Sequence, residues 1–239
     1  MNTSRRAEPV SSSAPLLVKR ALDLGFTLVA SLVLLPFALV AGLLVRVTSP
    51  GPILHRATRI GRRGIPFALF KFRTMVAEAP RLGPGLTHRD DPRITAVGRI
   101  LRKTKFDEFP QVINVLKGDM SIIGPRPEAP QYAEAYPKDF KSILQMRPGL
   151  TSLAQVAHRN EEQMLPAEDT EDFYLSVILP RKLSMDMYYA DHWSLGLDLR
   201  VFLLGVLALL KVAPPAWLWP ADVVVSLPAE DPRIMSSRN

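Results

Sequence analysis

An uncharged apolar run from Leu24 to Val45 is the feature that most constrains this chain. The run is 22 residues long, and a helix of that length crosses a hydrocarbon core of ~30 Å. Pro36 lies close to the middle of the run, where a proline removes a backbone hydrogen bond and bends a helix. The run therefore predicts a membrane helix that is broken at this proline.

Three interpretations of the run compete. A signal peptide has a shorter apolar region, of about 7–15 residues, and a convincing cleavage site, which is missing here. A spanning helix places one basic flank outside the cytoplasm, against the positive-inside rule. We favour a re-entrant helix, which keeps both flanks inside, while a single span with a mild kink at Pro36 stays open. The basic residues of the flanks are Lys19, Arg20, Arg46, Arg56, Arg59, Arg62 and Arg63.

The rest of the chain divides around this helix. Residues 1–15 have little apolar content and predict a disordered tail, and residues 16–47 form the membrane segment. Residues 48–212 predict a compact domain, and residues 213–239 predict a loosely ordered C-terminal tail. We expect a mainly α fold with a small β element, with amphipathic helices at the membrane interface.

Composition limits the partners and the catalytic groups. The net charge is +7 and the chain has no cysteine. A basic chain suits anionic partners, whereas the missing thiols exclude disulfides, zinc–thiolate sites and a cysteine nucleophile. The basic residues flank a membrane segment and no nucleic-acid-binding motif occurs, so we predict no nucleic-acid partner.

A basic hairpin follows the membrane segment. Residues Ile53–His55 and Ile65–Phe72 predict short strands, with a turn at Gly61–Gly64 between them. The arginines of this region suit anionic lipid head groups, to which each contributes about 1 kcal/mol. Lys71 and Arg73, at the end of the second strand, are candidates for binding an anionic substrate.

The residues after the hairpin predict a loop and then a helix. Residues 76–91 are rich in proline, glycine and charge, which is typical of a mobile loop. From Ile94 to Lys105, apolar side chains recur at helical spacing between basic ones. This pattern predicts a basic amphipathic helix that lies on a membrane surface or packs on a core.

The stretch from Asp107 to Glu128 opens on two adjacent carboxylates and closes on an arginine between two prolines. Pro110 suits the first turn of a short helix that Gly118 ends. A helix N-terminus stabilises anions, so it could bind a phosphate beside the acid pair. A simple capping role for Asp107 explains the spacing equally well. The side chains expected to pack inward are Val112, Ile113, Val115 and Leu116.

Three further segments complete the chain. Residues Met146–Val156 predict a turn and a short strand, and residues 158–171 predict a polar surface loop. Residues Phe173–Tyr189 predict a mixed helix. The apolar run Val201–Leu210 is too short to span a bilayer and predicts a buried or interfacial helix.

Several blocks occur in one order: KRALDL before the broken apolar run, KFRTM, DPRITAVGRILRKTKFDEFPQVINVLKGDMSIIGPRPE, RPGLTSLAQV and DMYYADHWSL. By these blocks the chain resembles the small monotopic phosphoglycosyl transferases, the bacterial sugar transferase family. The resemblance covers residues 19–212, and the long central block is its most specific part. It implies a re-entrant membrane helix and a catalytic face on the cytoplasmic side of the bacterial inner membrane.

The resemblance also implies a reaction. Members transfer a sugar-1-phosphate from a UDP-sugar to a polyprenyl (undecaprenyl) phosphate, release UMP and require Mg²⁺, in the first membrane step of exopolysaccharide or related glycan synthesis. By this match Asp107 is the nucleophile, forming a phosphosugar-aspartyl intermediate, and also the metal ligand. Glu108 deprotonates or orients the acceptor, and Arg126 binds phosphate. The match places four more residues near the site: Lys71, Arg102, Arg147 and Asp186.

Two departures from the family pattern bear on nucleotide or sugar contacts. Ala57 replaces a frequent glutamine, and SLAQ at residues 152–155 stands where members often have GWAQ. The main rival interpretation is a non-catalytic, membrane-attached, lipid-binding scaffold. It explains the apolar run and its basic flanks, but not a proline-fixed arginine that follows a carboxylate pair. Membrane lipid is a partner under both interpretations, and a homo-oligomer is compatible with both.

Overall fold

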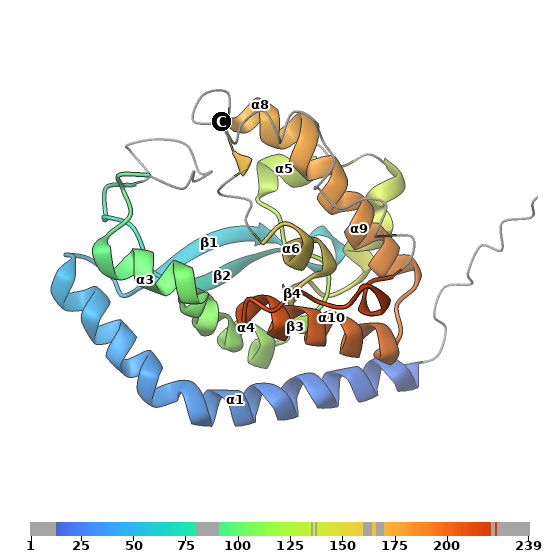
Figure 1. Cartoon of the computed structure of the whole chain (residues 1–239), viewed down its shortest axis with the longest axis horizontal. Helices are drawn as coiled ribbons and strands as arrows, with labels where there is room; N and C mark the ends of the chain where they lie inside the picture. Colours follow the sequence, from blue (N-terminus) through green and yellow to red (C-terminus); the bar gives the residue numbers. More distant parts are fainter. Residues whose placement is uncertain are drawn as a thin grey trace, which may run out of the picture.

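A computed structural model describes residues 13–79, 91–134, 136, 138–159, 164–165, 170–220 and 223. A long N-terminal helix, α1, runs along one side of the molecule, and the other elements pack on one face of it (Figure 1). Over the described ranges the fold is mainly helical with two small two-stranded sheets. This confirms the predicted mainly α fold with a small β element.

Helix α1 (Ser13–Thr48) extends beyond the predicted membrane segment at both ends. It stays helical through Pro36, so the predicted break at this proline is wrong. Figure 1 shows a bend in its middle part, as expected where a proline cannot donate a backbone hydrogen bond. By length and composition it could cross a membrane. Its first turn corrects the predicted tail, of which residues 1–12 lie outside the described part of the chain.

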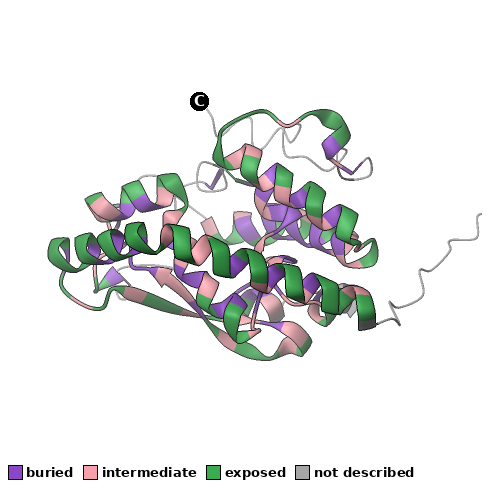
Figure 2. Ribbon diagram, turned by 90° about the horizontal axis from the view of Figure 1, so that it is seen from below, coloured by how far each residue is buried: buried purple, intermediate pink, exposed green. Residues whose placement is uncertain are grey.

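One face of α1 is exposed along its length (Figure 2). This face is apolar, and its exposed side chains include Leu17, Leu22, Leu32, Phe37, Leu43 and Val47. On the opposite face Ala38, Ala41 and Val45 pack in a core cluster with Phe72 and Leu101. A soluble surface rarely exposes so much contiguous apolar area, so the outer face of α1 suits a lipid environment.

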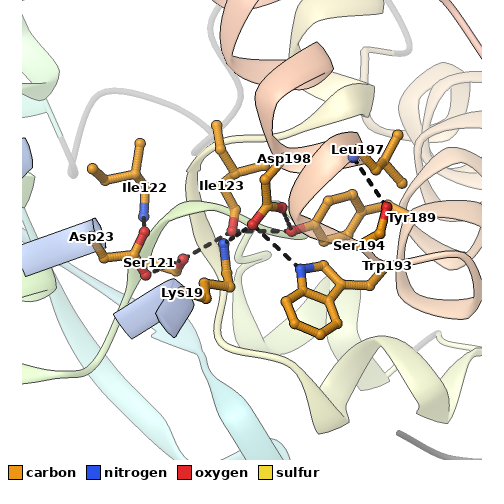
Figure 3. Close-up of polar contacts among 10 residues, drawn as sticks. All are labelled: Lys19, Asp23, Ser121, Ile122, Ile123, Tyr189, Trp193, Ser194, Leu197 and Asp198. Atoms are coloured by element: carbon orange, nitrogen blue, oxygen red, sulfur yellow. Dashed lines mark hydrogen bonds and ion pairs between the residues drawn. The ribbon is translucent and has the colours of Figure 1, made fainter. Parts of the chain in front are cut away.

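Buried polar side chains fix the first half of α1 to the domain (Figure 3). The Nζ of Lys19 donates to Oδ2 of Asp198 at 2.7 Å. The carboxylate of Asp23 accepts hydrogen bonds from the hydroxyl of Ser121 at 2.7 Å and from the backbone N–H of Ile122 at 3.1 Å. Because buried polar groups need partners, these bonds define where α1 sits on the domain.

The predicted basic hairpin is confirmed. Strand β1 (Leu54–Ile60) pairs antiparallel with β2 (Pro66–Phe72), and the 3₁₀ turn η1 (Arg62–Gly64) joins them. β1 is longer than the predicted three residues because its whole length pairs with β2. On the inner face of the hairpin, Leu69 packs in a small core cluster with Val115.

The basic helix and the short helix after it are also confirmed. Helix α3 (Ala96–Thr104) begins after Thr95, whose side chain caps it. Helix α4 (Val112–Lys117) ends at Gly118, which takes the left-handed conformation. Between the two helices, the acid pair lies in a 3₁₀ helix, η2 (Phe106–Gln111).

Two expectations for this stretch are wrong. Asp107 caps no helix, because neither η2 nor α4 has a side-chain cap at its N-terminus. Ile113 and Leu116 do not pack inward but are 39% and 45% exposed. A helix of two turns buries only one face, so the outer side chains of α4 stay accessible.

The second sheet is a short parallel pair, β3 (Ser121–Ile123) and β4 (Gly149–Thr151). Glycine allows the backbones to approach closely here, since a Cβ added to Gly124 would lie 2.4 Å from the carbonyl oxygen of Arg147. The short strand predicted within Met146–Val156 is confirmed as the three residues of β4.

The strand ends where a helix begins. The hydroxyl of Ser152 accepts the backbone N–H of Gln155 and so caps α6 (Leu153–Ala157). The other helices are α5 (Pro130–Glu134), η3 (Lys138–Gln145), α8 (Thr170–Phe173), the π-helical η4 (Tyr174–Ile178), α9 (Leu179–Asp191), α10 (Leu195–Leu209) and η5 (Ala216–Leu218).

The C-terminal half follows the prediction in its helices. The mixed helix predicted over Phe173–Tyr189 is confirmed as the continuous run of α8, η4 and α9. The short apolar helix is α10, which buries Val201 and Leu204 and exposes Leu209. It is therefore partly buried, as its length and composition predict.

Two segments predicted to be loose contain core residues. Met164 and Leu165 pack in one core cluster, and Leu218 and Val223 pack in another. These apolar side chains therefore hold one point of the predicted polar loop and one part of the predicted C-terminal tail against the core. Of the predicted loops and tails, the residues outside the described chain are 80–90, 160–163, 166–169, 221–222 and 224–239.

Helix α3 passes the hairpin so closely that Gly98 has no room for a side chain. A Cβ at this position would lie 2.0 Å from the carbonyl oxygen of Thr74. We predict that Gly98→Ala lowers the free energy of unfolding by about 2–3 kcal/mol through overpacking against backbone. Thermal unfolding of the purified protein in detergent measures this.

The matched control is Gly25→Ala in α1. Nothing lies within 4 Å of a Cβ at Gly25, and alanine favours a helix over glycine. This variant should unfold at or above the wild-type temperature. Equal stability of Gly98→Ala and wild type would contradict the close packing of α3.

Candidate active site

The acid pair lies where the chain turns from α3 into η2. Lys105 takes the left-handed conformation, with φ of 58°, and ends α3. Asp107 and Glu108 follow in the first turn of η2, and Pro110 lies inside this short helix. Asp107 is 8% exposed, and the side chain of Glu108 is 12% exposed. The local sequence therefore turns two adjacent carboxylates into the domain.

Three side chains from different elements donate hydrogen bonds to Glu108. The Nζ of Lys71, in β2, donates to Oε1 at 3.0 Å, and Nη2 of Arg126 donates to the same oxygen at 3.2 Å. The Nε2 of Gln155, in α6, donates to Oε2 at 3.2 Å. Both carboxylate oxygens are thus engaged, and two of these donors are cations.

These cations decide the ionisation of Glu108. Burial alone would raise its pKa, but the positive charges of Lys71 and Arg126 outweigh burial and hold the pKa of Glu108 well below its usual range. Glu108 is therefore a carboxylate at physiological pH. A group with so low a pKa is a weak base, so its surroundings suit organising the two cations better than accepting a proton.

Asp107 has different surroundings. Burial raises the pKa of its carboxyl group, the charge of Lys71 opposes this effect, and the charge of Glu108 adds to it. The buried Oδ1 of Asp107 accepts no hydrogen bond from the described residues. A buried carboxylate oxygen without a partner is costly, which makes this oxygen a candidate contact for a substrate or a cation.

Arg126 is positioned through its backbone as well as its side chain. The neighbouring prolines, Pro125 and Pro127, have fixed φ angles and stiffen the loop after β3. The backbone N–H of Arg126 donates to Oδ2 of Asp186 at 2.9 Å. The guanidinium of Arg126 therefore reaches Glu108 from a loop that is held at a second point.

Asp186 is a buried acid with one unmatched oxygen. It is 3% exposed, and burial raises its pKa to about 7, although the backbone N–H of Arg126 opposes this effect. Its Oδ1 accepts no hydrogen bond in the part of the chain that the structure describes. Asp186 therefore changes its charge near neutral pH at the point that holds the Arg126 loop.

A buried ion pair braces the same loop from α9. The Nζ of Lys182 lies 3.1 Å from Oε1 of Glu128, and the hydroxyl of Tyr174 donates to Oε2 of Glu128 at 3.1 Å. Burial would raise the pKa of Glu128, but the charge and hydrogen bond of Lys182 lower it. The loop that carries Arg126 is thus tied to the C-terminal helices.

The structure brings most of the predicted site residues together, as these contacts show. Arg102 joins them, since its positive charge acts on Asp107 and its Nε donates to Oγ1 of Thr74 at 2.9 Å. The site therefore combines an acid pair with cations from β2, α3 and the loop after β3.

Arg73 lies elsewhere and has a structural role. Its guanidinium is buried and donates to the carbonyl oxygens of Ser49 at 2.6 Å and Pro50 at 2.5 Å. It also donates to the carbonyl oxygen of Val45, in the last turn of α1. The guanidinium of Arg73 thus holds the carbonyl groups at the end of α1, and its expected contact with a substrate stays a prediction.

Arg147 also departs from its expected place. Its Nε donates to the carbonyl oxygen of Gly118 at 3.1 Å. Gly118 follows the last turn of α4, whereas Asp107 and Glu108 precede the first turn. The structure thus puts Arg147 at the far end of α4 from the acid pair and not in contact with it.

Sequence reasoning missed Gln155, because it assigned this residue to a strand. The signal that predicts otherwise is SLAQ at residues 152–155, a serine followed three residues later by glutamine, which is typical of a helix start. The hydroxyl of Ser152 does cap the helix, accepting the Gln155 N–H at 2.9 Å. The Gln155 side chain reaches Glu108 instead of closing the capping box.

Residues 14–212 match the sequence model of a protein family described as "Bacterial sugar transferase". The chain is 37% identical over 211 residues to the UDP-glucose:undecaprenyl-phosphate glucose-1-phosphate transferase of Caulobacter vibrioides, covering 87% of this chain and 75% of that protein.

Two other relatives show the same likeness. The chain is 37% identical to the exopolysaccharide production protein PSS of Rhizobium leguminosarum, covering 78% of this chain and 92% of that protein. It is 33% identical to the UDP-N-acetylgalactosamine-undecaprenyl-phosphate N-acetylgalactosaminephosphotransferase of Aeromonas hydrophila, covering 77% of this chain and 41% of that protein.

The raised pKa of Asp186 predicts a pH-dependent stability difference. Folding raises this pKa from 3.8 to about 7, so folding favours the protonated form. The stability that Asp186 contributes is full below the unfolded pKa and is lost as the pH rises through about 7.

The variant Asp186→Asn stays neutral and keeps an acceptor for the Arg126 N–H. Its melting temperature, minus that of wild type, should rise between about pH 5 and about pH 8. Thermal unfolding of both proteins in one buffer series measures the difference. A difference that stays constant over this range would contradict the raised pKa.

Proposed function

Because the chain belongs to the bacterial sugar transferase family, we propose that it transfers a sugar-1-phosphate from a UDP-sugar to polyprenyl phosphate. The names of its relatives support undecaprenyl phosphate as the acceptor and exopolysaccharide synthesis as the setting. The observation that carries the proposal is the buried acid pair, in which cations engage Glu108 while Asp107 keeps an unmatched oxygen.

Asp107 is the nucleophile of the proposed reaction. Its carboxylate attacks the phosphorus next to the sugar, a new P–O bond forms, and the bond to UMP breaks, so that UMP leaves. A phosphate oxygen of the acceptor then attacks the same phosphorus and displaces the carboxylate. The products are UMP, a polyprenyl diphosphate sugar and the regenerated acid. A covalent intermediate lets a soluble donor and a lipid acceptor react in turn at one site.

Glu108 organises the phosphate-binding cations. A phosphate monoester has a second pKa near 6 and is largely a dianion at neutral pH, so the acceptor needs no strong base. The low pKa of Glu108 supports a positioning role over proton removal. With its charge and its Oε1 atom, Glu108 holds Lys71 and Arg126 side by side.

Lys71, Arg126 and Arg102 are the proposed phosphate ligands. An anion attacks a diphosphate only when the negative charge is offset, and fixed cations at a transferring phosphoryl group usually make the largest contribution to lowering the barrier. Arg126 suits this role best, because its planar guanidinium can bind two phosphate oxygens and its loop is held at Asp186.

The family implies Mg²⁺, and the residues present fit it. Protein Mg²⁺ sites use one or two carboxylates together with substrate phosphates. The described residues hold no cluster of three acidic or histidine side chains, but the Asp107 carboxylate offers a buried, unmatched oxygen. We assign the metal to Asp107 and the donor diphosphate. When bound, the ion neutralises phosphate charge.

The structure supports a re-entrant position for α1. Its first half is bonded to the domain through Lys19 and Asp23, and its last turn is bonded to Arg73 of the same domain. A helix that spanned the bilayer would separate its two ends by ~30 Å of hydrocarbon. We therefore place both ends, and the acid pair, on the cytoplasmic face of the bacterial inner membrane, with the outer face of α1 in lipid.

A lipid-binding scaffold is the weaker alternative. It accounts for the apolar face of α1, but it gives no reason to bury Asp107 with an unmatched oxygen. A scaffold also has no need for Gln155 and two cations on Glu108. Both features are explained by chemistry on a phosphate.

The first test is UMP release by the purified full chain with a panel of UDP-sugars, polyprenyl phosphate and Mg²⁺. We predict that Asp107→Asn lowers the rate by about 10³-fold or more, because it removes the nucleophile. The control Asp172→Asn removes an exposed carboxylate from α8 and should keep the wild-type rate. Full turnover by Asp107→Asn would contradict the nucleophile assignment, and no release by wild type with any donor would favour the scaffold.

The second test is the topology of α1. The chain has no cysteine, so single cysteines at Ala14 and Thr48, which are exposed near the helix ends, can be labelled selectively. We predict that a membrane-impermeant maleimide reaches both positions only from the cytoplasmic side, in inverted vesicles. Labelling of the two positions from opposite sides would show a spanning helix instead.

A further inference from the structure

A basic groove lies on the surface at the tip of the β1–β2 hairpin. It has a volume of about 310 Å³ and lies between the hairpin turn and the end of α4. We call it the arginine groove, because its lining includes Arg62, Arg63 and Arg147, together with Ile65, Gly118 and Asp119. None of the residues that contact Glu108 lines it, so it is a different surface from the acid-pair site.

Two of its arginines are anchored in a way that leaves their terminal nitrogens available. The Nε of Arg62 donates to the carbonyl oxygen of Gln145 at 2.8 Å. The Nε of Arg147 donates to the carbonyl oxygen of Gly118 at 3.1 Å. An arginine held through Nε keeps both terminal nitrogens, which together match the oxygens of a phosphate.

The groove brings three arginines together with a single acidic side chain in its lining. Burial is the main cause that lowers the pKa of Arg62, followed by the positive charges of Arg147 and Arg63. Of the residues that line the groove, Asp119 is the acidic one, and its Oδ2 lies 3.3 Å from Nζ of Lys117. The repulsion between the arginines is relieved when an anion enters.

The backbone of the hairpin turn is strained at the groove. Arg63 has φ of 61°, in the left-handed region that side chains rarely adopt. The turn contains glycines at positions 61 and 64, yet an arginine takes this left-handed conformation between them. Strain of this kind concentrates at functional sites, and here it falls on an exposed arginine of the groove.

The groove also adjoins the membrane helix. A Cβ added to Gly118 would lie 3.6 Å from Nη2 of Arg20, in the first half of α1. The same guanidinium donates to the carbonyl oxygen of Leu116 at 3.3 Å. Ile65, which lines the groove, is 63% exposed. Basic and apolar groups beside a lipid-facing helix are the pattern of a surface that meets head groups.

We propose that the arginine groove binds the phosphate of an anionic membrane lipid, at a site separate from the acid pair. The proposal goes beyond the transfer reaction and depends only on α1 lying in the membrane. A bound lipid phosphate would fix the hairpin against the bilayer, and with it Lys71 at the other end of β2.

The test measures lipid binding to the purified full chain in neutral detergent by calorimetric titration. The probes are dihexanoyl phosphatidylglycerol, dihexanoyl phosphatidylcholine and inorganic phosphate. The groove variant is Arg62→Gln/Arg63→Gln. The control, Arg56→Gln, removes one charge from the exposed face of the same hairpin, outside the groove. Melting temperatures establish that each variant is folded.

We expect wild type and Arg56→Gln to bind phosphatidylglycerol more tightly than either other probe. The groove variant should bind it about 20-fold more weakly, since one basic side chain at an anionic lipid contributes about fivefold. Unchanged binding by the folded groove variant would overturn the proposal. So would equal binding of the two lipids by wild type, a measurement that needs no variant. Equally tight binding of inorganic phosphate would overturn it as well, by showing a phosphate site that is not a lipid site.

Discussion

The ionised carboxylate of Glu108 is the interaction on which the site depends. Its donors come from β2, from the loop after β3 and from α6, so one buried charge joins three elements to η2. Removing such partners from a buried carboxylate strongly destabilises the folded protein, so no one of these elements can move away from η2 without this cost. Two of the three donors are held in turn, the Arg126 loop by Asp186 and α6 by the cap at Ser152. The result is a rigid cationic frame beside Asp107.

The frame also explains how neighbouring acids take different roles. Both carboxylate oxygens of Glu108 accept hydrogen bonds from the frame, whereas Asp107 has a buried oxygen with no hydrogen bond from the described residues. The environment, not the residue type, thus separates an organising acid from one that can react. The domain that contains this frame is hydrogen-bonded to both halves of α1. In the proposed mechanism this arrangement holds the site at a bilayer surface, where a soluble donor and a lipid acceptor can both reach it.

The sequence predicts this fold well where local chemistry decides it. The Pro36 bend, the basic hairpin, the helix ending at Gly118 and the acid pair all follow from spacing and turn residues. Long-range contacts decide the rest. Arg73 follows Lys71 by two residues, yet it donates to carbonyl groups in the last turn of α1 and just after it. Gln155 enters the site because the fold brings its side chain within hydrogen-bonding distance of Glu108, 47 residues away in the sequence, which no local pattern reveals.

In the proposed mechanism Asp107 carries the sugar-phosphate between the two substrates. Mass spectrometry of the full chain, incubated with a UDP-sugar and Mg²⁺ but without acceptor, tests this step most directly. The covalent mechanism predicts a mass increase of one sugar phosphate on the peptide that contains Asp107, which polyprenyl phosphate then removes. Turnover with acceptor by a protein that never carries this mass, or carries it on another residue, would contradict the mechanism.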